Sequence, residues 1–418
     1  MKTILLFSTL FIATLLAFSC SKSEPTQNTN TSGIRQMRTA ENALLASSNQ
    51  FCFDYFALLS QQKPSENILF SPYSAHAALS MLIYGASGET KQEIKNALRI
   101  SSQSDDSIKS CFKSLKDYLV QVDKGVTLNI ANSVWAKQEF TVAPNLSAIL
   151  KEYYQAEVNS LDFSNPQSVI TINNWVNTQT NGKIPTIIDQ ISADAVMFII
   201  NAVYFKSDWK TKFNKNLTQK ASFVKDDKSV ISVDMMKSDK MEGNYFKNED
   251  VELVDLPFGN GAYSFTILLP NATTTLDNFA ATFNESKWAN LLKAIPNSTT
   301  NLMLKMPRFE FAFETEMNEN LKTLGMKRAF TDQAELPNLF TEKLPLTVSK
   351  VKQKTYIKIY EDGGEAAAVT SIEVGVTSIP VQPQYIEINR PFMCLIRERN
   401  SNTILFIGKV HTPEFSVN

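Results

Sequence analysis

Residues 364–376 form an alternating pattern that fits one kind of secondary structure. Counting from Gly364, the even-numbered residues are small or apolar throughout, while the odd-numbered set carries both charges, Glu365 and Glu373. Alternation with a period of two is typical of a strand that buries one face. Fully extended at about 3.3 Å per residue, the segment would reach roughly 43 Å, which is long for a strand.

The residues on either side argue that this segment does not pair with neighbouring strands at once. Upstream, Gly363 and Gly364 are typical of a hinge or turn because glycine tolerates unusual backbone angles. Downstream, Pro380 and Pro383 cannot donate ladder hydrogen bonds and would end a strand. We therefore predict a loop that can become a strand. An ordinary edge strand after a glycine-rich turn is the alternative that the pattern leaves open.

Composition limits the classes of protein that fit. The chain has 418 residues, of which 43% are hydrophobic and 10% aromatic, so it can bury a large core. A folded part of roughly 375 residues would exceed the usual size of one domain. The net charge of −1 argues against a nucleic-acid surface. His76 and His411 are the only histidines, and HExxH, GxSxG and paired CxxC motifs are missing, so we expect neither an enzyme nor a metal or cofactor site.

Apolar spacing predicts helices in the N-terminal half and strands later. Strands alternate with helices from Leu128, and strands dominate from Leu253. This succession favours an α+β fold. The predicted N-terminal helices cover residues 40–59, 74–84, 90–98 and 105–122.

Two motifs near the C-terminus resemble signatures of the serpin family. EDGGEAAAVT, residues 361–370, resembles the serpin hinge, and IEINRPFMCLI, residues 386–396, resembles the C-terminal serpin signature. Further matches, such as NILFSPYSAHAALSMLIYGASGET and INAVYFKSDWKTKF, extend the resemblance from about Asn42 to Pro413. The resemblance implies the serpin fold, with eight or nine helices, three β-sheets and an exposed reactive-centre loop. It assigns that loop to residues 361–383 of a serpin domain covering residues 42–418.

The resemblance also implies a function. Serpins act as suicide substrates: a serine or cysteine protease cuts the loop, forms an acyl-enzyme and is trapped when the freed hinge inserts into the main sheet. No proline or bulky residue interrupts this hinge, although Gly364 stands where the family prefers threonine or serine. A non-inhibitory serpin acting as a carrier or chaperone is the alternative. The hinge residues are Glu361, Gly363, Gly364, Glu365, Ala366, Ala367, Ala368, Val369 and Thr370.

Family spacing places the bond that the protease cuts between Thr377 and Ser378, with cleavage after Val376 as the alternative. No Arg, Lys, Phe, Tyr, Leu or Met lies between Ser371 and Pro380. A trypsin-like pocket would therefore find no cation to bind, and small side chains suit shallow pockets. We expect an elastase-like protease, or one of broad small-residue specificity, as the partner.

Two further groups of residues are implied by the resemblance. The shutter group, beneath the centre of the main sheet, is Ser71, Ser74, Asn201 and Gln353. Gln353 stands where many serpins have histidine, so we expect no histidine-linked pH response there. Ser71 followed by Pro72 also fits a helix N-cap with proline in the first turn. The breach group, where insertion starts, is Trp209, Arg308 and Glu361. A partly exposed Arg308–Glu361 pair would contribute about 0.2–1 kcal/mol.

The N-terminus is predicted to be a leader and a tether. Residues 1–19 combine one lysine with a short apolar run, which is typical of a secretory signal. Leu16 to Cys20 resembles a bacterial lipobox, with cleavage before Cys20 and lipid on its thiol; a plain signal with a chance cysteine is the alternative. Residues 20–41 would then be the lipidated cysteine and a polar tether. This order suggests the envelope of a Gram-negative bacterium, with the protein anchored in the outer membrane and facing the surface or the periplasm.

The remaining expectations concern thiols and assembly. Cysteines in helical and strand patterns are expected to be buried and free; they are Cys52, Cys111 and Cys394. The protein is expected to be a monomer that is liable to polymerise, because an unpaired β-prone loop can insert into a neighbour's sheet.

Overall fold

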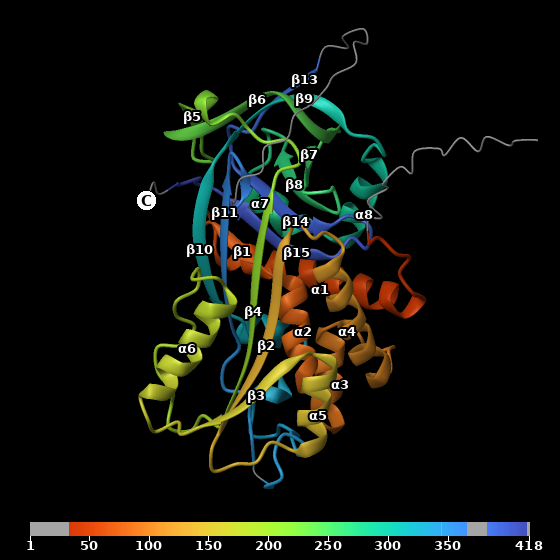
Figure 1. The fold of residues 1–418 in the computed structure, drawn as a ribbon, viewed down its shortest axis with the longest axis vertical. Helices are drawn as coiled ribbons and strands as arrows, with labels where there is room; N and C mark the ends of the chain where they lie inside the picture. The colour runs from red at the N-terminus through yellow and green to blue at the C-terminus, as the bar shows by residue number, and fades with distance from the viewer. Residues whose placement is uncertain (1–32, 344, 366–382, 416–418) are drawn as a thin grey trace, which may run out of the picture. The chain divides into compact units, whose positions relative to one another are not determined.

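The computed structural model describes residues 33–343, 345–365 and 383–415 (Figure 1). The four predicted N-terminal helices are present, each within a few residues of its expected ends, because the apolar spacing follows the helical period. The described part contains nine α-helices: α1 (Thr39–Gln62), α2 (Pro72–Leu82), α3 (Gly88–Ala97), α4 (Asp105–Gln121), α5 (Pro144–Tyr153), α6 (Gln167–Gln179), α7 (Leu276–Thr282), α8 (Glu285–Ala294) and α9 (Asn318–Thr323).

Six strands form the sheet that carries the hinge, in the order β10-β11-β12-β4-β2-β3. Neighbours are antiparallel except β2 and β3. The long strands β10, β11, β4 and β2 lie side by side in Figure 1. The bounds are β2 (Thr127–Lys137), β3 (Ala156–Leu161), β4 (Met197–Asp208), β10 (Phe309–Glu316), β11 (Lys352–Tyr360) and β12 (Gly363–Gly364).

The other strands form one connected path, β1-β15-β14-β8-β7-β6-β9-β13, with β5 also paired to β6. The long strand β6 pairs with β5 and β9 over its first part and with β7 over its last residues, so it joins two smaller sheets. With the six-stranded sheet, this confirms the predicted three-sheet α+β architecture. The bounds are β1 (Ile68–Phe70), β5 (Gln219–Val224), β6 (Val230–Lys247), β7 (Val251–Phe258), β8 (Tyr263–Pro270), β9 (Thr300–Pro307), β13 (Gln384–Glu387), β14 (Phe392–Glu398) and β15 (Ile404–Val410).

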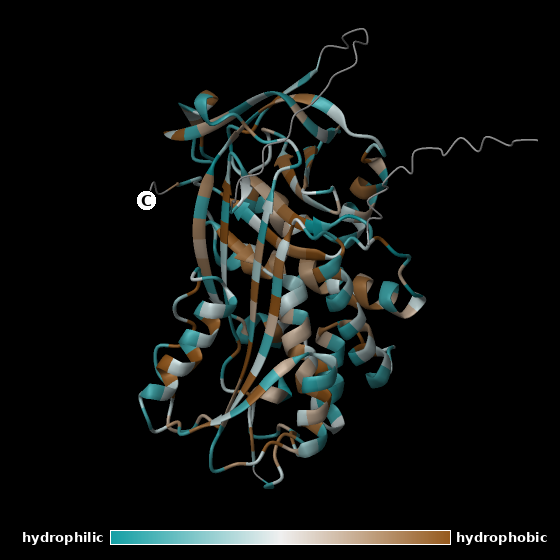
Figure 2. Cartoon of the chain, in the orientation of Figure 1, coloured by the Kyte–Doolittle hydropathy of each residue, from teal (hydrophilic) through white to brown (hydrophobic). Residues whose placement is uncertain are grey.

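Helices cover both faces of the six-stranded sheet. On one face, Ile172 and Val176 of α6 pack with Trp135 of β2 and with Ile200 and Ala202 of β4. The opposite face belongs to the main core, to which α1, α2, β14 and β15 contribute. Figure 2 shows apolar and polar residues mixed along the long strands, as expected when successive side chains point to opposite faces. The six-stranded sheet therefore lies between two apolar clusters.

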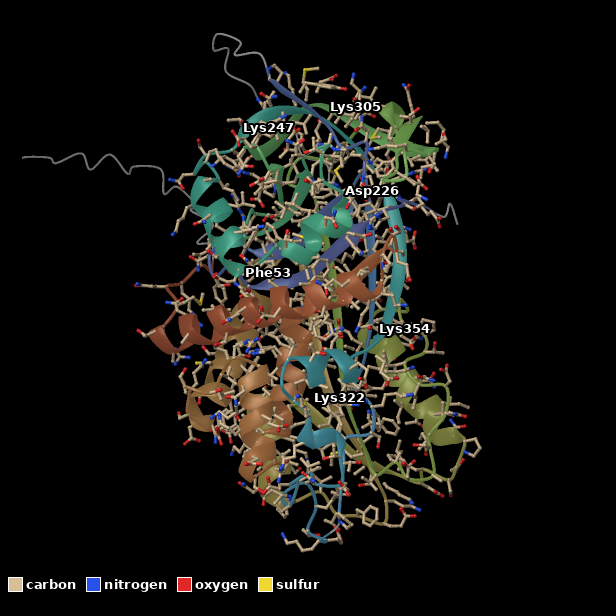
Figure 3. All side chains as sticks on the ribbon, turned by 180° about the vertical axis from the view of Figure 1, so that it is seen from behind. Phe53, Asp226, Lys247, Lys305, Lys322 and Lys354 are labelled. Carbon is tan, nitrogen blue, oxygen red and sulfur yellow. The ribbon has the colours of Figure 1, made fainter. Side chains whose placement is uncertain are left out.

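Helix α1 crosses the back of the molecule, where Figure 3 labels Phe53 on it. The Phe53 ring lies 5.5 Å from the ring of Phe283 and 6.3 Å from that of Trp288. All three side chains are buried. Such clustered rings contribute dispersion and edge-to-face energy beyond area burial alone, so α1 is fixed against the helices α7 and α8.

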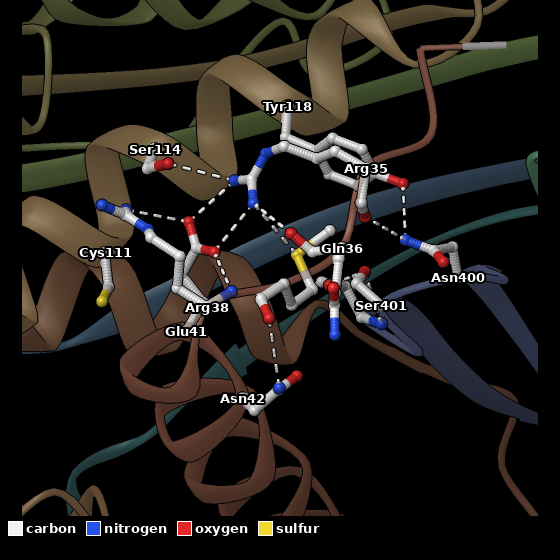
Figure 4. Close-up of polar contacts among 12 residues, drawn as sticks. Arg35, Gln36, Arg38, Glu41, Asn42, Cys111, Ser114, Tyr118, Asn400 and Ser401 are labelled. Carbon is white, nitrogen blue, oxygen red and sulfur yellow. Dashed lines mark hydrogen bonds and ion pairs between the residues drawn. The ribbon is translucent and has the colours of Figure 1, made fainter.

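The described chain is anchored to the folded body from its first residues (Figure 4). Arg35 donates to Glu41 Oε1 at 2.7 Å and Oε2 at 2.8 Å and also reaches Ser114 Oγ of α4 at 3.0 Å. Asn400 donates to the carbonyl of Arg35 at 2.9 Å. Burial opposes ionisation of Glu41, but the hydrogen bonds from Arg35 and Arg38 outweigh it and hold the pKa of this carboxyl far below its usual range. Residues 35–41 of the predicted tether therefore contact α4 and the β14–β15 turn.

His76 predicts how stability depends on pH. The side chain is buried in α2, and Nε2 lies 2.9 Å from the carbonyl oxygen of Leu98, which fits a neutral ring that donates from Nε2. Burial lowers the His76 pKa to about 4. The unfolded chain, with a pKa near 6.5, binds the proton first, so stability present above about pH 6.5 is lost as the pH falls to about 4, by about 3 kcal/mol.

Urea unfolding at several pH values measures this loss. His76→Gln, which can keep the hydrogen bond to Leu98 but does not titrate, should show a shallower decline with falling pH than the wild type. Equal declines in the two proteins would contradict the assignment.

The predicted thiol state is confirmed in the described part of the chain. Cys52, Cys111 and Cys394 are free and buried. Burial raises the pKa of Cys394 to about 12 and raises that of Cys111 as well, so these thiols are poor nucleophiles. None of the described helices is both long enough and apolar enough to cross a bilayer.

Candidate functional site

The hinge begins as a strand of only two residues, β12, which lies between β11 and β4. Gly363 pairs with Tyr360 and Asp208, and Gly364 pairs with Ile359 and Ser207. The backbone dictates the first glycine: Gly363 has φ +153°, and a Cβ atom there would lie 2.1 Å from the carbonyl oxygen of Ser207. At Gly364 the nearest atom to such a Cβ is 3.7 Å away, so the threonine or serine of the family pattern would fit. Gly364 is therefore a departure that the local packing does not require.

The described hinge ends at Glu365, whose φ of 42° lies in the left-handed region. Its carboxylate forms an ion pair with Lys183 Nζ at 2.6 Å. The rest of the predicted hinge and reactive bond lies outside the described residues, as does the predicted lipidation site Cys20. Those hinge and reactive-bond residues are Ala366, Ala367, Ala368, Val369, Thr370, Val376, Thr377 and Ser378.

The structure brings the breach group together at the top of β11. Arg308 donates to Glu361 Oε1 at 3.3 Å, and the indole of Trp209 donates to the carbonyl of Tyr360 at 2.8 Å. The Trp209 ring stacks on Phe258 at 4.4 Å between centroids. The ion pair is less exposed than expected, because only 4% of the Glu361 side chain and 21% of the Arg308 side chain reach solvent. Screening is therefore weaker than for a surface pair.

Two partners of the breach group were not identified from the sequence. Thr218 donates to Glu361 Oε1 at 2.7 Å, and Asp234 Oδ2 accepts from Arg308 at 3.2 Å. Burial raises the pKa of Asp234, but hydrogen bonds from Lys220 and Arg308 outweigh burial and leave this pKa below its ordinary value. Asp234 lies in the motif VDMMK, and a charge placed directly between the apolar residues Val233 and Met235 was the available signal.

Glu361→Lys should accelerate polymerisation on warming. The new ammonium would face Arg308 in a largely buried site and lose the hydrogen bond from Thr218. Repulsion and desolvation together should cost at least about 2 kcal/mol, equivalent to roughly a thirtyfold faster loss of monomer if the cost falls on the closed form. Size-exclusion chromatography after warm incubation measures the monomer that remains.

Glu361→Gln is the matched control, because an amide can still accept from Thr218 while removing only the negative charge. It should polymerise at a rate between those of the wild type and Glu361→Lys. Monomer loss at the wild-type rate in Glu361→Lys would contradict the assigned role.

The shutter group is also brought together, in two pairs at the start of α2. Gln353 Oε1 accepts from the backbone N–H of Ser71 at 2.8 Å, and its amide donates to the Ser71 carbonyl at 2.9 Å. Ser74 donates to Asn201 Oδ1, and Asn201 donates to Asn132 of β2 at 2.6 Å. A glutamine serves here because it both donates and accepts. The start of α2 thereby binds β11 through the backbone of Ser71 and β4 through the side chain of Ser74.

Ser71 occupies the N-cap position of α2 with Pro72 in the first turn, as the alternative interpretation expected. Its hydroxyl does not cap the helix and instead donates to the carbonyl of Leu405 in β15 at 2.7 Å. Both interpretations of Ser71 therefore apply: the residue starts the helix, and its side chain joins the polar group. Within residues 33–343, 345–365 and 383–415, no cluster of His, Cys, Asp and Glu is arranged to hold a metal ion.

Comparison with known proteins agrees with this geometry. The family model described as "Serpin (serine protease inhibitor)" matches residues 46–413. Serine protease inhibitor 42Dd of Drosophila melanogaster is 32% identical over 86% of this chain and 95% of its own length. The crystal structure of the thermophilic serpin tengpin in its native state has a TM-score of 0.80 at 29% identity, covering 90% of this chain and 95% of that chain. Human thyroxine-binding globulin complexed with its ligand has a TM-score of 0.81 at 25% identity, covering 90% of this chain and all of that one. The chain belongs to the serpin family.

Proposed function

We propose that this serpin inhibits proteases as a suicide substrate, by inserting its cleaved loop between β11 and β4. The observation that carries the proposal is the position of β12. Its two glycines already form ladders with both strands. In the described residues, β11 and β4 are joined within the sheet through β12 alone. Their facing edges therefore offer backbone groups to an added strand, and β-sheets readily accept such strands.

The register of β12 supports continued insertion. Extended in the same antiparallel register, Ala366 would lie between Ile357 of β11 and Phe205 of β4. Both residues line a cavity of about 20 Å³ beside Gly364. This space suits a small side chain, and the sequence supplies alanine. Two residues further on, Ala368 would lie between Thr355 and Val203, where its methyl side chain again needs little space.

In the same register, the apolar second half of the loop would lie along a larger cavity. Ile372, Val374 and Val376 would lie opposite Val351, Ser349 and Thr347 of the β11 side, and opposite Ile199, Met197 and Ala195 of the β4 side. All six partner residues line a cavity of about 330 Å³ between α2 and the lower end of this sheet. Burying three aliphatic side chains there would stabilise the inserted form by about 5–9 kcal/mol. The closed form is therefore metastable.

The polar centre of the sheet matches the loop as well. Thr370 would lie between Gln353 and Asn201, the two shutter residues on the strands that part. Its hydroxyl can donate to one amide and accept from the other, so insertion exchanges hydrogen bonds instead of leaving buried groups unpaired.

The chemistry follows from the target's own catalytic group. Its serine or cysteine nucleophile attacks the carbonyl of Thr377, the amine of Ser378 leaves with a proton, and an ester or thioester joins the two proteins. Insertion then carries the protease away from its productive geometry before water hydrolyses this bond. The serpin supplies the metastable fold and the loop that the protease cuts. The catalytic residues belong to the protease.

Small residues around the reactive bond favour an elastase-like protease. Incubation with elastase should give a denaturant-resistant adduct, and a denaturing gel should also show a C-terminal peptide that begins at Ser378, or at Thr377 if cleavage follows Val376. Trypsin should give neither. An adduct with trypsin alone would contradict the proposed specificity.

A non-inhibitory role is the second candidate, because thyroxine-binding globulin, a structural neighbour, is known in complex with its ligand. A carrier would need a stable closed form. In this chain, by contrast, the facing edges of β11 and β4 beyond β12 can accept an added strand. Stability before and after loop cleavage separates the two candidates.

The envelope location is a further part of this proposal. Its support is the lipobox-like sequence ending at Cys20 and the polar residues that follow. Labelling of cells with a fatty-acid analogue should mark the wild-type protein and leave Cys20→Ala unmarked; equal labelling of both would contradict lipidation.

A further inference from the structure

Glu365 is held apart from the ladder that ends one residue before it. Its φ of 42° is unfavourable for a residue with a Cβ atom. Its carboxylate lies 2.6 Å from Lys183 Nζ, and both side chains are largely buried, at 18% and 28% exposure. An ion pair with this little solvent is weakly screened. The contact therefore favours a hinge whose pairing stops at Gly364.

Lys183 approaches from outside the sheet. It follows α6, the helix that packs over β2 and β4, and its ammonium also lies 5.3 Å from the ring centroid of Tyr356 on β11. The ion pair thus joins the hinge to the α6 segment, on the side of the sheet opposite to the shutter group.

The register identifies a second position for the same carboxylate. One more residue of pairing would place Glu365 between Lys358 of β11 and Lys206 of β4. Directly opposed residues on antiparallel strands have side chains on one face, about 5 Å apart. Lys358 is already paired with Glu310 at 3.0 Å. Lys206 is half-buried, and its ammonium has neither an ion pair nor a hydrogen bond among the residues that the structure describes.

We propose that Glu365 exchanges Lys183 for Lys206 when the hinge inserts. Lys183 and Lys206 are then positioning residues for the two states of the same carboxylate. Because one ion pair replaces another, the Glu365 carboxylate keeps a cationic partner through the first insertion step, and Glu365 gains an extended backbone. This inference rests on the proposed function and adds the residues that control its first step.

Double-mutant cycles on the uncut protein, and on protein whose loop has been nicked by a protease that it does not trap, test the exchange. In the uncut protein, Glu365→Gln should lower the melting temperature by about 2 °C in the wild-type and Lys206→Met backgrounds, and have no effect in Lys183→Met. In the nicked protein the dependence should reverse: Glu365→Gln should matter in the Lys183→Met background and not in Lys206→Met. A merely structural role of either lysine would not change partner between the two forms.

Lys247→Met is the matched control, since Lys247, labelled in Figure 3, lies on β6 outside the six-stranded sheet and pairs with Glu252 at 2.9 Å. It should leave the effect of Glu365→Gln unchanged in both forms. If the wild type inhibits elastase but Glu365 couples to the same lysine, or to neither, in both forms, this inference is overturned and the proposed function stands. If the wild type forms no adduct and gains no stability when nicked, both are overturned.

Discussion

Cutting the reactive-centre loop with a protease that the loop does not trap should raise the melting temperature of this protein by at least about 10 °C. In the register set by β12, insertion buries Ile372, Val374 and Val376 in the cavity beneath the lower end of the sheet. Their burial contributes about 5–9 kcal/mol, and ladder hydrogen bonds to β11 and β4 add to it. The melting temperature of a large domain rises by roughly 2 °C per kcal/mol of added stability, so this gain corresponds to a rise of at least about 10 °C.

Calorimetry of intact and nicked protein measures this rise. Limited cleavage near the N-terminus, before Arg35, is the control, because it cuts the chain without releasing the hinge and should leave the melting temperature unchanged. Equal melting temperatures for the intact and loop-cleaved forms would show a protein that does not insert its loop, as expected for a carrier.

Ile372→Asp should convert the inhibitor into a substrate. The extended register places residue 372 between the apolar side chains of Val351 and Ile199. The two lysines that also line this cavity, Lys350 and Lys352, are already paired with Glu316 and Glu314. Burying an unpaired charge costs several kcal/mol, which removes most of the gain from insertion. Deacylation then precedes trapping, and the number of inhibitor molecules consumed per trapped protease should rise at least about tenfold.

Ser371→Asp is the matched control, because it adds the same charge one residue earlier. Its side chain would project from the opposite face of the inserted strand, beside Lys352. This variant should trap elastase as the wild type does and show the same rise in melting temperature on cleavage. Equal loss of trapping in both variants would show that the two faces of the inserted segment are not distinguished, and the register would be wrong.

The sequence predicted only some of the residues that form the shutter and breach groups. The family resemblance grouped Ser71, Ser74, Asn201 and Gln353, and the structure joins them in two pairs, Ser71 with Gln353 and Ser74 with Asn201. Sequence reasoning did not find Thr218 and Asp234, which complete the breach group. Thr218 directly precedes β5 and Asp234 lies in β6. The pattern of one segment does not reveal which residues of a distant segment lie beside it.

The resemblance of the motifs to serpin signatures implied the α+β serpin fold. Periodicity predicted the helices of the N-terminal half and the alternating pattern of the loop, because local spacing reports which face of an element is buried. Only the tertiary structure gave the register of β12 and the cavities that residues inserted in this register would fill. It also identified the two lysines that can pair with Glu365. Register fixes every cross-strand neighbour at once, and a slip of one residue would turn each side chain to the other face. That information lies in the pairing of β12 with β11 and β4, which are far apart in the chain.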